Sequence, residues 1–237
     1  MPNVSSFAVV VSSLSLAACA QRVYTPPTQF LPLESAAIAA PGDVIVHAEG
    51  GHAGELFGPN IVTGNARLRL GVAENLEVAV SGSALRVATD APSKANRGLY
   101  AGRVGLKSQF APWVAFVGGV GAGYAPAGGA YAGVDGAFVA SYENCILVPF
   151  VSAGGYGSAP MRARAIDVTD ADNTGLVTDT PSKTFGLGLG AGVKLKLTGC
   201  RREHAVSLLA GWQSTHVWDY QTTTGFFGMS GGLEISL

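Results

Sequence analysis

The sequence predicts an all-β protein: a closed, up-and-down antiparallel barrel of about ten strands whose outer face lies in a membrane. Three observations support this transmembrane barrel. Apolar and polar residues alternate along most of the chain, the strands are longer than those of soluble sheets, and the connections alternate between long and short. No stretch of eleven residues shows a helical period, so no significant helix is expected. Eight strands is the alternative count.

The expected strands follow from apolar residues that recur at every second position after Gly42. Each run is roughly 10 to 14 residues long, whereas strands of soluble sheets have about five or six. A tilted strand needs about 9–11 residues to cross the hydrocarbon layer of a bilayer, so these lengths favour a membrane. The expected strands are 43–52, 62–72, 76–86, 98–109, 114–124, 130–142, 146–156, 184–197, 204–214 and 225–237.

The connections between these strands provide the second discriminator. In chain order they have about 9, 3, 11, 4, 5, 3, 27, 6 and 10 residues, so long and short connections alternate. Membrane barrels have short turns at one end and longer loops at the other. A soluble sandwich has no comparable reason to sort its connections by length.

The cost of placing charge in lipid assigns the two faces, as in the stretch "RLRLGVAENLEVAVSGS" at 67–83. If Arg67 and Arg69 faced lipid near the bilayer midplane, each would cost roughly 2–4 kcal/mol. We therefore expect the apolar face to meet lipid and the polar face to line the interior. A slip of one residue in the strand register would invert every face, so this pattern specifies the register strongly.

The charged side chains expected in the barrel interior need partners, because unpaired buried charges are costly. One interpretation is a structural ion-pair network that fills the lumen; the other is a selectivity lining for a small anionic solute. Ten strands lie near the closed limit of barrel size. The inward glycines Gly186, Gly188, Gly190 and Gly192 leave room for a narrow passage or relieve strand curvature. The expected lumen charges are Glu49, Arg67, Arg69, Glu77, Arg86, Arg103, Lys107, Asp135 and Glu234.

The N-terminus reads as an export signal followed by a tether. "FAVVVSSLSLAAC", at 7–19, is too short to span a bilayer and ends in small residues, as in a secretory signal. The ending Leu-Ala-Ala-Cys resembles the bacterial lipobox, which implies a signal peptide of lipoprotein type at 1–18 and lipidation of Cys19. Ala20, rather than Asp, implies sorting to the outer membrane. Residues 19–42 contain four prolines and no period, so we expect a flexible periplasmic tether ahead of the barrel at 43–237.

The pattern over 43–237 resembles the bacterial outer-membrane β-barrel superfamily, as a small porin-like barrel of no specific subfamily. The last strand, "FGMSGGLEISL", resembles the C-terminal signal of that superfamily, although Leu237 stands where an aromatic residue is usual. The resemblance implies a Gram-negative outer membrane, extracellular loops and periplasmic termini. It also implies contact with outer-membrane lipid and lipopolysaccharide, and handling by the barrel assembly and lipoprotein sorting machinery.

Two cysteines lie in connections expected at the same end of the barrel. Cys145 falls in the short turn before the seventh expected strand and Cys200 in the turn after the eighth. Because those strands are neighbours, we expect a disulfide, which an oxidising periplasm permits; two free thiols are the alternative. A Cα separation above about 7 Å would exclude the bridge.

Catalytic residues are weakly indicated. Asp170 and Asp172 in the long loop, together with "HVWD" at 216–219, superficially resemble the acid and histidine residues of the omptin proteases, but their spacing differs. The loop is more readily explained as solvated, or as a Ca²⁺ or lipopolysaccharide-bridging site. His47 beside Glu49 fits an interior hydrogen bond. No CxxC, HExxH, phosphate-loop or haem motif is present, so no cofactor is expected.

The function expected from the sequence is non-enzymatic, with a rim hydrolase as the only enzymatic candidate. The barrel is structural, or it binds or passes a small solute through a narrow polar lumen. Two alternatives remain: a surface adhesion or partner-binding protein acting through the loop at 157–183, and a soluble lipocalin-like barrel anchored by lipid. The net charge of −1 gives no electrostatic reason to expect a nucleic-acid partner.

Overall fold

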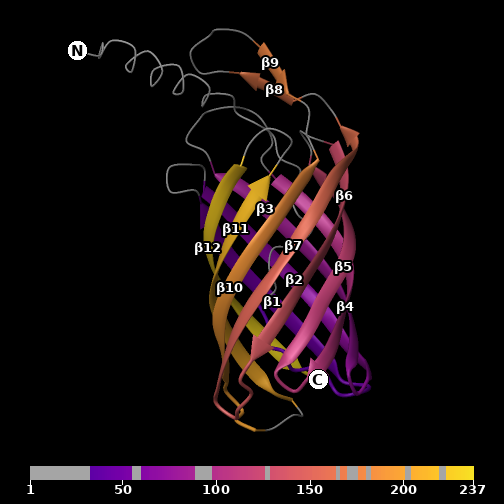
Figure 1. Cartoon of the computed structure of the whole chain (residues 1–237), viewed down its shortest axis with the longest axis vertical. Helices are drawn as coiled ribbons and strands as arrows, with labels where there is room; N and C mark the ends of the chain where they lie inside the picture. Colours follow the sequence, from indigo (N-terminus) through magenta and orange to yellow (C-terminus); the bar gives the residue numbers. More distant parts are fainter. Residues whose placement is uncertain are drawn as a thin grey trace, which may run out of the picture.

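The computed structural model describes residues 33–54, 60–88, 98–125, 129–163, 166–169, 176–179, 183–200, 204–218 and 223–237. Within these ranges the chain is almost entirely β-strand (Figure 1). The expected signal peptide, Cys19 and the first part of the expected tether lie outside the described residues. In the described part of the chain, no helix is long and apolar enough to span a membrane.

Ten strands close into one barrel in the order β1-β12-β11-β10-β7-β6-β5-β4-β3-β2, each antiparallel to both neighbours. The first and last barrel strands, β1 and β12, pair with each other, so no sheet edge is left open. Each strand expected from the sequence overlaps its observed counterpart, and the count of ten is confirmed. The barrel strands are β1 (Val44–Gly54), β2 (Asn60–Ala73), β3 (Leu76–Ala88), β4 (Gly98–Ala111), β5 (Val114–Ala125), β6 (Gly129–Ser141), β7 (Leu147–Ala163), β10 (Thr184–Lys196), β11 (Val206–Trp218) and β12 (Thr223–Ser236).

The alternation of side chains between the two faces follows the pleat of each strand. On β2, Leu68 and Leu70 are 51% and 40% exposed, whereas Arg67 and Arg69 between them are 4% and 3% exposed. Successive side chains of a strand point to opposite faces, so one pattern of sequence yields both an apolar exterior and a charged interior. The faces assigned from the sequence are confirmed on this strand.

The outer face of the barrel is apolar and is edged by aromatic side chains at both ends. Exposed aliphatic side chains such as Val80, Val104 and Leu189 cover the middle of the strands. Aromatic girdles flanking an apolar band are typical of transmembrane barrels, where they lie at the two membrane interfaces. A soluble barrel would turn this face inward, so the lipocalin-like alternative is wrong. The exposed aromatic residues near the strand ends include Phe110, Trp113 and Tyr142 at one end and Tyr100, Tyr124 and Phe185 at the other.

The two ends of the barrel differ in their connections. We name as the turn end the one with connections 74–75, 112–113, 142–146 and 197–205 and the C-terminus, and as the loop end the opposite one. The strict alternation expected from the sequence is wrong, because the turn-end connections 142–146 and 197–205 exceed the loop-end connections 126–128 and 219–222. The strands flanking those two loops extend further than the lipid-facing pattern alone indicated.

A disulfide joins the two longer turn-end connections. Cys145 in 142–146 and Cys200 in 197–205 are bonded, with their Cα atoms 4.5 Å apart. The strands that carry these connections, β7 and β10, are hydrogen-bonded neighbours from Leu147 to Ser158, which is the arrangement the sequence led us to expect.

The long connection between β7 and β10 contains regular structure that the sequence analysis missed. β7 continues to Ala163, seven residues beyond its expected end, and a separate two-stranded antiparallel sheet follows. That sheet consists of β8 (Ile166–Thr169) and β9 (Leu176–Asp179) and lies beyond the loop end of the barrel (Figure 1). The four-residue strands were missed because so short a run shows too few repeats of the two-residue period.

The end of the expected tether is not a tether. Residues 33–42, here called the lumen segment, enter the barrel, and Glu34 and Ala36 are 1% and 0% exposed. At the turn end, the segment extends the backbone hydrogen bonding between β1 and β2. The Gly42 N–H donates to the Gly71 carbonyl, and the Gly71 N–H donates to the Asp43 carbonyl. The expected boundary between tether and barrel at residue 42 is therefore wrong for residues 33–42, because these residues find polar partners inside the lumen.

Candidate functional site

The lumen segment crosses the barrel near the turn end and contacts strands on opposite walls. The Ala39 N–H donates to Glu77 on β3 at 3.1 Å, and the Ala36 N–H donates to the Ser141 hydroxyl on β6 at 2.9 Å. At its far end, the Leu33 side chain packs with Phe150 of β7 and Leu209 of β11 in a small apolar cluster. The segment therefore forms a transverse plug across the lumen.

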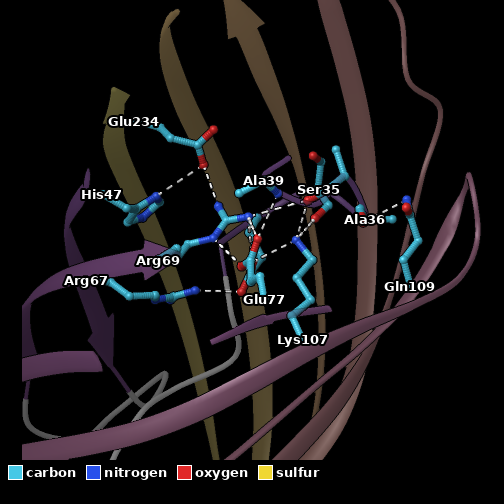
Figure 2. Close-up of polar contacts among 12 residues, drawn as sticks. Ser35, Ala36, Ala39, His47, Arg67, Arg69, Glu77, Lys107, Gln109 and Glu234 are labelled. Carbon is cyan, nitrogen blue, oxygen red and sulfur yellow. Dashed lines mark hydrogen bonds and ion pairs between the residues drawn. The ribbon is translucent and has the colours of Figure 1, made fainter. Parts of the chain in front are cut away.

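Arg69 is the centre of the ion-pair cluster beside this plug, between Glu234 and Glu77 (Figure 2). Its guanidinium donates from Nε and Nη2 to both oxygens of Glu77, at 2.5 and 2.9 Å. The remaining nitrogen, Nη1, donates to Glu234 on β12 at 2.9 Å, and Glu234 also pairs with Lys194 on β10. Such bidentate, charge-assisted bonds hold β2, β3, β10 and β12 in one fixed geometry.

Glu34 is the carboxylate that the lumen segment contributes to the cluster. It accepts from Arg67 Nη1 at 2.6 Å and from the Lys107 ammonium at 3.0 Å, while Arg69 Nη2 lies 3.8 Å away. Three cations from β2 and β4 thus converge on one carboxylate that is almost inaccessible to solvent. Because a buried cation without a partner is costly, Glu34 stabilises the wall as well as the segment.

Among the described residues, the hydrogen bonds of Lys107 all go to the lumen segment. Its ammonium has three N–H donors, and they go to the Glu34 carboxylate and to the Ser35 and Ala37 carbonyls, the last two at 2.7 Å each (Figure 2). One residue further along the inner face of β4, Gln109 donates to the Ala36 carbonyl at 3.2 Å. The inner face of β4 at the turn end is therefore the docking strand for the segment.

The charges of this cluster balance only when the lumen segment is included. Leaving out His47, which lies 3.0 Å from Glu49 and 3.8 Å from Glu234, four cations meet four carboxylates in the described residues, and one of those carboxylates is Glu34. The wall alone holds the same four cations against three carboxylates. The cations are Arg67, Arg69, Lys107 and Lys194, and the carboxylates are Glu34, Glu49, Glu77 and Glu234.

Two glycines of the wall make room for the lumen segment. A Cβ at Gly71 would lie 2.1 Å from the Ala40 carbonyl oxygen and 2.6 Å from that of Ala39. At Gly211, a Cβ would lie 2.7 Å from Leu33 Cδ1, and also close to the neighbouring backbone of β10. Any side chain at Gly71 would collide with the segment backbone, so this position is shaped for the segment.

Arg67 is bonded on one side only. Its Nη1 holds Glu34, but Nε and Nη2 are buried without a hydrogen-bond partner, and Nη2 lies 4.0 Å from a Glu49 oxygen. Glu49 is itself bonded to His47 at 3.0 Å and to Asn65 at 2.9 Å. This places His47 and Glu49 in an interior hydrogen-bonding pair, the arrangement expected from the sequence.

A second, separate ion pair lies halfway along the lumen. Arg103 on β4 donates from Nε and Nη2 to both oxygens of Asp135 on β6, at 2.7 and 2.5 Å. The strand between them, β5, carries Gly119 at the crossing point, where a Cβ would lie 2.5 Å from the Arg103 guanidinium carbon. The missing side chain lets the guanidinium lie flat across β5.

The space over the lumen glycines is occupied. A Cβ at Gly186 would lie 2.2 Å from the Tyr156 ring, and one at Gly192 would lie 2.5 Å from the Phe150 ring. Both rings come from the neighbouring strand β7 and rest on the glycine positions. At these two positions, the glycines therefore accommodate aromatic side chains and do not leave the open wall that the sequence suggested.

Glu143 in the turn-end connection 142–146 anchors the rim of the barrel. It accepts from the Ser141 hydroxyl at 2.8 Å and pairs with Lys196 at 3.2 Å. Burial raises the pKa of Glu143, but hydrogen bonds from Ser141 and Ser35 and the charge of Lys196 outweigh it, so the pKa lies below its ordinary value. The carboxylate form is thus favoured, and it ties the lumen segment to the turns.

Several residues singled out from the sequence do not belong to this site. Arg86 was expected inside, but it shares the outward side of β3 and is exposed near the loop end, where a cation can reach water. His216 was expected in a loop but lies on β11 facing outward, with its ring 6.2 Å from that of Trp218. Asp170 and Asp172 lie outside the described residues. Within the described ranges, no three His, Cys, Asp or Glu side chains group in a way that could hold a metal.

Glu34 is the site residue that the sequence analysis missed. The only signal available was a single acidic residue in the otherwise uncharged run "LPLESAAIAAPG" at 31–42. A carboxylate amid small apolar residues directly before a barrel whose lumen is rich in cations is a candidate partner for them. That inference requires the barrel to be assumed first, because Lys107 is 73 residues away in the chain.

Comparison with known proteins shows likeness in fold alone. No protein-family model and no curated protein matches the chain. Among solved structures, Neisserial surface protein A is 15% identical, with a TM-score of 0.40 over 81% of this chain and 95% of that one. The β domain of the Bordetella autotransporter BrkA is 8% identical, with a TM-score of 0.45 over 83% and 100% of the two chains. Outer membrane protease OmpT from Escherichia coli is 10% identical, with a TM-score of 0.35 over 87% and 100%.

Proposed function

We propose that the protein is a non-enzymatic outer-membrane barrel that is closed by its own lumen segment and acts as a structural element of the envelope. One observation carries the proposal: the segment crosses the lumen with Glu34 bonded to cations of β2 and β4. A solute path would have to pass the same cross-section. The balanced charges of the plugged lumen favour a stable, closed wall over an open channel.

Electrical recording tests this proposal. The purified, refolded wild-type protein is added to a planar lipid bilayer, and folding is verified by its heat-modifiable mobility on a gel. The expected result is a silent bilayer in the presence of folded protein. Steady conductance from the wild-type barrel would contradict a closed lumen and would favour the alternative of a small-solute channel.

The non-enzymatic part of the proposal rests on the bonding of the lumen acids. Glu34, Glu77 and Asp135 each accept hydrogen bonds from lysine or arginine side chains, so their oxygens are not free to take a proton from a substrate. The rim hydrolase needed His216 near loop carboxylates, and its ring instead faces outward from β11. Neither wild type nor His216→Ala is expected to cleave a peptide mixture analysed by mass spectrometry; cleavage by wild type that His216→Ala abolishes would contradict the non-enzymatic proposal.

Membrane location and anchoring are further parts of the proposal. Barrels of the bacterial outer membrane keep short turns in the periplasm and longer loops outside, which supports our proposal that the loop end faces the cell surface. Lipidation of Cys19 would add an anchor. Metabolic labelling with a fatty acid, comparing wild type with Cys19→Ser, tests the anchor. Protease treatment of intact cells should cleave within 157–183 if the loop end is extracellular.

A second candidate function, binding of a surface partner, has one specific observation in its favour. β7 has 17 residues, more than any other described strand, and together with the β8–β9 sheet it extends the structure past the loop end. Replacing 164–182 with a short Gly-Ser linker should leave the barrel folded but abolish adhesion of whole cells to a host-cell layer. Unchanged adhesion would exclude this role.

A further inference from the structure

We propose that the lumen segment is a displaceable plug, and that its displacement opens a narrow path for small inorganic anions with Lys107 as their main contact. The inference rests on the proposed function, because it assumes that the wild-type barrel is closed by this segment. Four features of the structure support it: a barrel complete without the segment, the way the segment is seated, the partners left to the wall cations, and the charge of the emptied lumen.

The barrel is complete without the lumen segment. β1 pairs with β12 over ten residue pairs, and every other barrel strand has two strand neighbours, so no backbone ladder of the ten-stranded barrel depends on residues 33–40. The segment's ladder contact with Gly71 involves only Gly42 and Asp43, at the start of β1. The part that crosses the lumen is therefore held mainly by side chains of the wall.

The lumen segment has few large apolar side chains to hold it in place. Of its ten residues, five are Ser35 and the alanines at 36, 37, 39 and 40, and its buried apolar cluster consists of Leu33 against Phe150 and Leu209. Its other contacts with the wall are ion pairs and hydrogen bonds, so its position depends on charge and on the space left by wall residues such as Gly71. A charge or steric change at the seat can therefore shift the segment without unfolding the wall.

Most wall cations keep a partner when the segment leaves. Arg69 retains Glu77 and Glu234. Nε and Nη2 of Arg67 have no hydrogen-bond partner, and together they form the edge of the guanidinium that can bind both oxygens of a carboxylate. The nearest candidate is Glu49, with an oxygen 4.0 Å from Nη2. A small rotation gives Arg67 a replacement for Glu34. Lys107 differs, because in the described part of the chain its three hydrogen-bond acceptors belong to the segment. Its cross-strand neighbour Glu77 is already bonded to Arg69 through both oxygens.

The emptied lumen would carry an excess of positive charge. Without Glu34, four cations remain in the cluster against three carboxylates. Among the described residues, Lys107 then has only Glu77, opposite it in the β3–β4 register, and Glu77 is already bonded to Arg69. A peptide chain is about 4.8 Å wide in the hydrogen-bonding direction of a sheet, so the vacated path admits a chloride-sized ion and excludes sugars or nucleotides. An anion would bind where the Glu34 carboxylate now lies.

The test displaces the segment by a steric change. Gly71→Leu places a side chain where the Ala39 and Ala40 carbonyls now lie. Gly82→Leu on β3 is the matched control, because a Cβ at that outward-facing glycine meets no atom within 4 Å. Glu34→Lys displaces the segment independently, by repulsion from Arg67 and Lys107. Each variant is recorded in a planar bilayer beside wild type, after a gel shows a heat-modifiable folded barrel.

A chemical probe reports the position of the segment in each variant. Ala36→Cys, in a Cys19→Ser background, puts a thiol at a position that is 0% exposed in the plugged barrel. In folded wild-type and Gly82→Leu barrels, this thiol should resist a membrane-impermeant maleimide. In Gly71→Leu and Glu34→Lys barrels it should react. A thiol that stays protected in both displacement variants would overturn the proposal, because the segment would not be displaceable.

The expected electrical result is anion-selective opening in Gly71→Leu and Glu34→Lys, with silence in wild type and Gly82→Leu. Adding Lys107→Gln to Gly71→Leu should reduce the anion-over-cation permeability ratio about 25-fold, because losing one unit charge about 4 Å from an ion in water changes the local concentration of the anion and of the cation by about fivefold each, in opposite directions. The inference would be overturned if a displacement variant showed no conductance although its thiol reacts, or if its openings favoured cations. Either result would still be consistent with a closed wild-type barrel. Conductance in wild type would instead refute the proposed function.

Discussion

The pair between Arg103 and Asp135 offers the clearest measure of what ion pairs in the lumen contribute to stability. It is bidentate, lies halfway along the barrel, and is separate from the turn-end cluster. The perturbation is a double-mutant cycle of Arg103→Met, Asp135→Ala and the two combined. Methionine keeps much of the volume of the arginine stem and removes its charge.

The magnitude follows from how deeply each partner is buried. Breaking a buried pair on one side costs about 3–5 kcal/mol, because the remaining charge is left without compensation. The Arg103 side chain is 2% exposed and that of Asp135 is 14% exposed. We therefore expect about 5 kcal/mol for Asp135→Ala, which strands the deeper charge, and about 3 kcal/mol for Arg103→Met. The double variant should cost no more than Asp135→Ala, so the coupling is about 3 kcal/mol.

The assay is urea unfolding of the barrel in lipid vesicles, with the free energy obtained by linear extrapolation and the folded fraction read from tryptophan fluorescence. Arg86→Met and Glu74→Ala provide a control cycle, because both residues are exposed and stand near opposite ends of β3. Control effects should be within about 0.5 kcal/mol and additive. If the Arg103 and Asp135 effects also add within about 0.5 kcal/mol, the pair is not a stabilising unit and the reasoning is refuted.

Three further predictions concern the lumen wall, the disulfide and the rim. Gly186→Ala should cost about 1–3 kcal/mol in the same unfolding assay, since its methyl group would collide with the tyrosine ring over it, whereas Gly82→Ala should be nearly neutral. Replacing Cys145 and Cys200 by serine should cost up to about 4 kcal/mol, the loop-closure value for their separation of 55 residues; an unchanged midpoint would argue against this estimate. Because the folded-state pKa of Glu143 is lowered, its contribution is fully present above the ordinary carboxyl pKa and is lost as the pH falls through the lowered value. Wild type should therefore be more stable than Glu143→Gln at pH 7, and urea unfolding near pH 3 should show that difference shrinking.

The barrel could be predicted from the sequence because its determinants are local. The two-residue period of "RLRLGV" at 67–72 places the leucines in lipid and the arginines in the lumen. That choice is set by the cost of a charge in hydrocarbon, which each residue incurs separately. Strand number and the pairing of Cys145 with Cys200 follow from counting such runs in order. Arg86 was misplaced because the same rule applies only within the apolar band, and near its edge a cation can face outward to water.

The site could be predicted only in part, because it depends on contacts between distant residues. The sequence indicated that Arg67, Arg69 and Lys107 face inward, but it could not show which carboxylate each would meet. Lys107 meets Glu34, 73 residues away, in a segment without any period. The need for glycine at 71 and 119 likewise depends on tertiary contacts, because the Ala40 carbonyl and the Arg103 guanidinium lie where a side chain at these positions would be.

By itself, the sequence determined an antiparallel membrane barrel with an apolar exterior and a charged interior. The face on which a residue lies follows from its position along the pleated strand and from its own free energy in lipid or water, and neither depends on distant residues. Only the tertiary structure decided that residues 33–42 close the lumen. That outcome needs the closed barrel first, because the barrel gathers cations from β2 and β4 around one point and leaves them short of one carboxylate. Glu34 lies in that position because burial makes an unpaired charge costly, and no other carboxylate contacts Lys107 in the described residues.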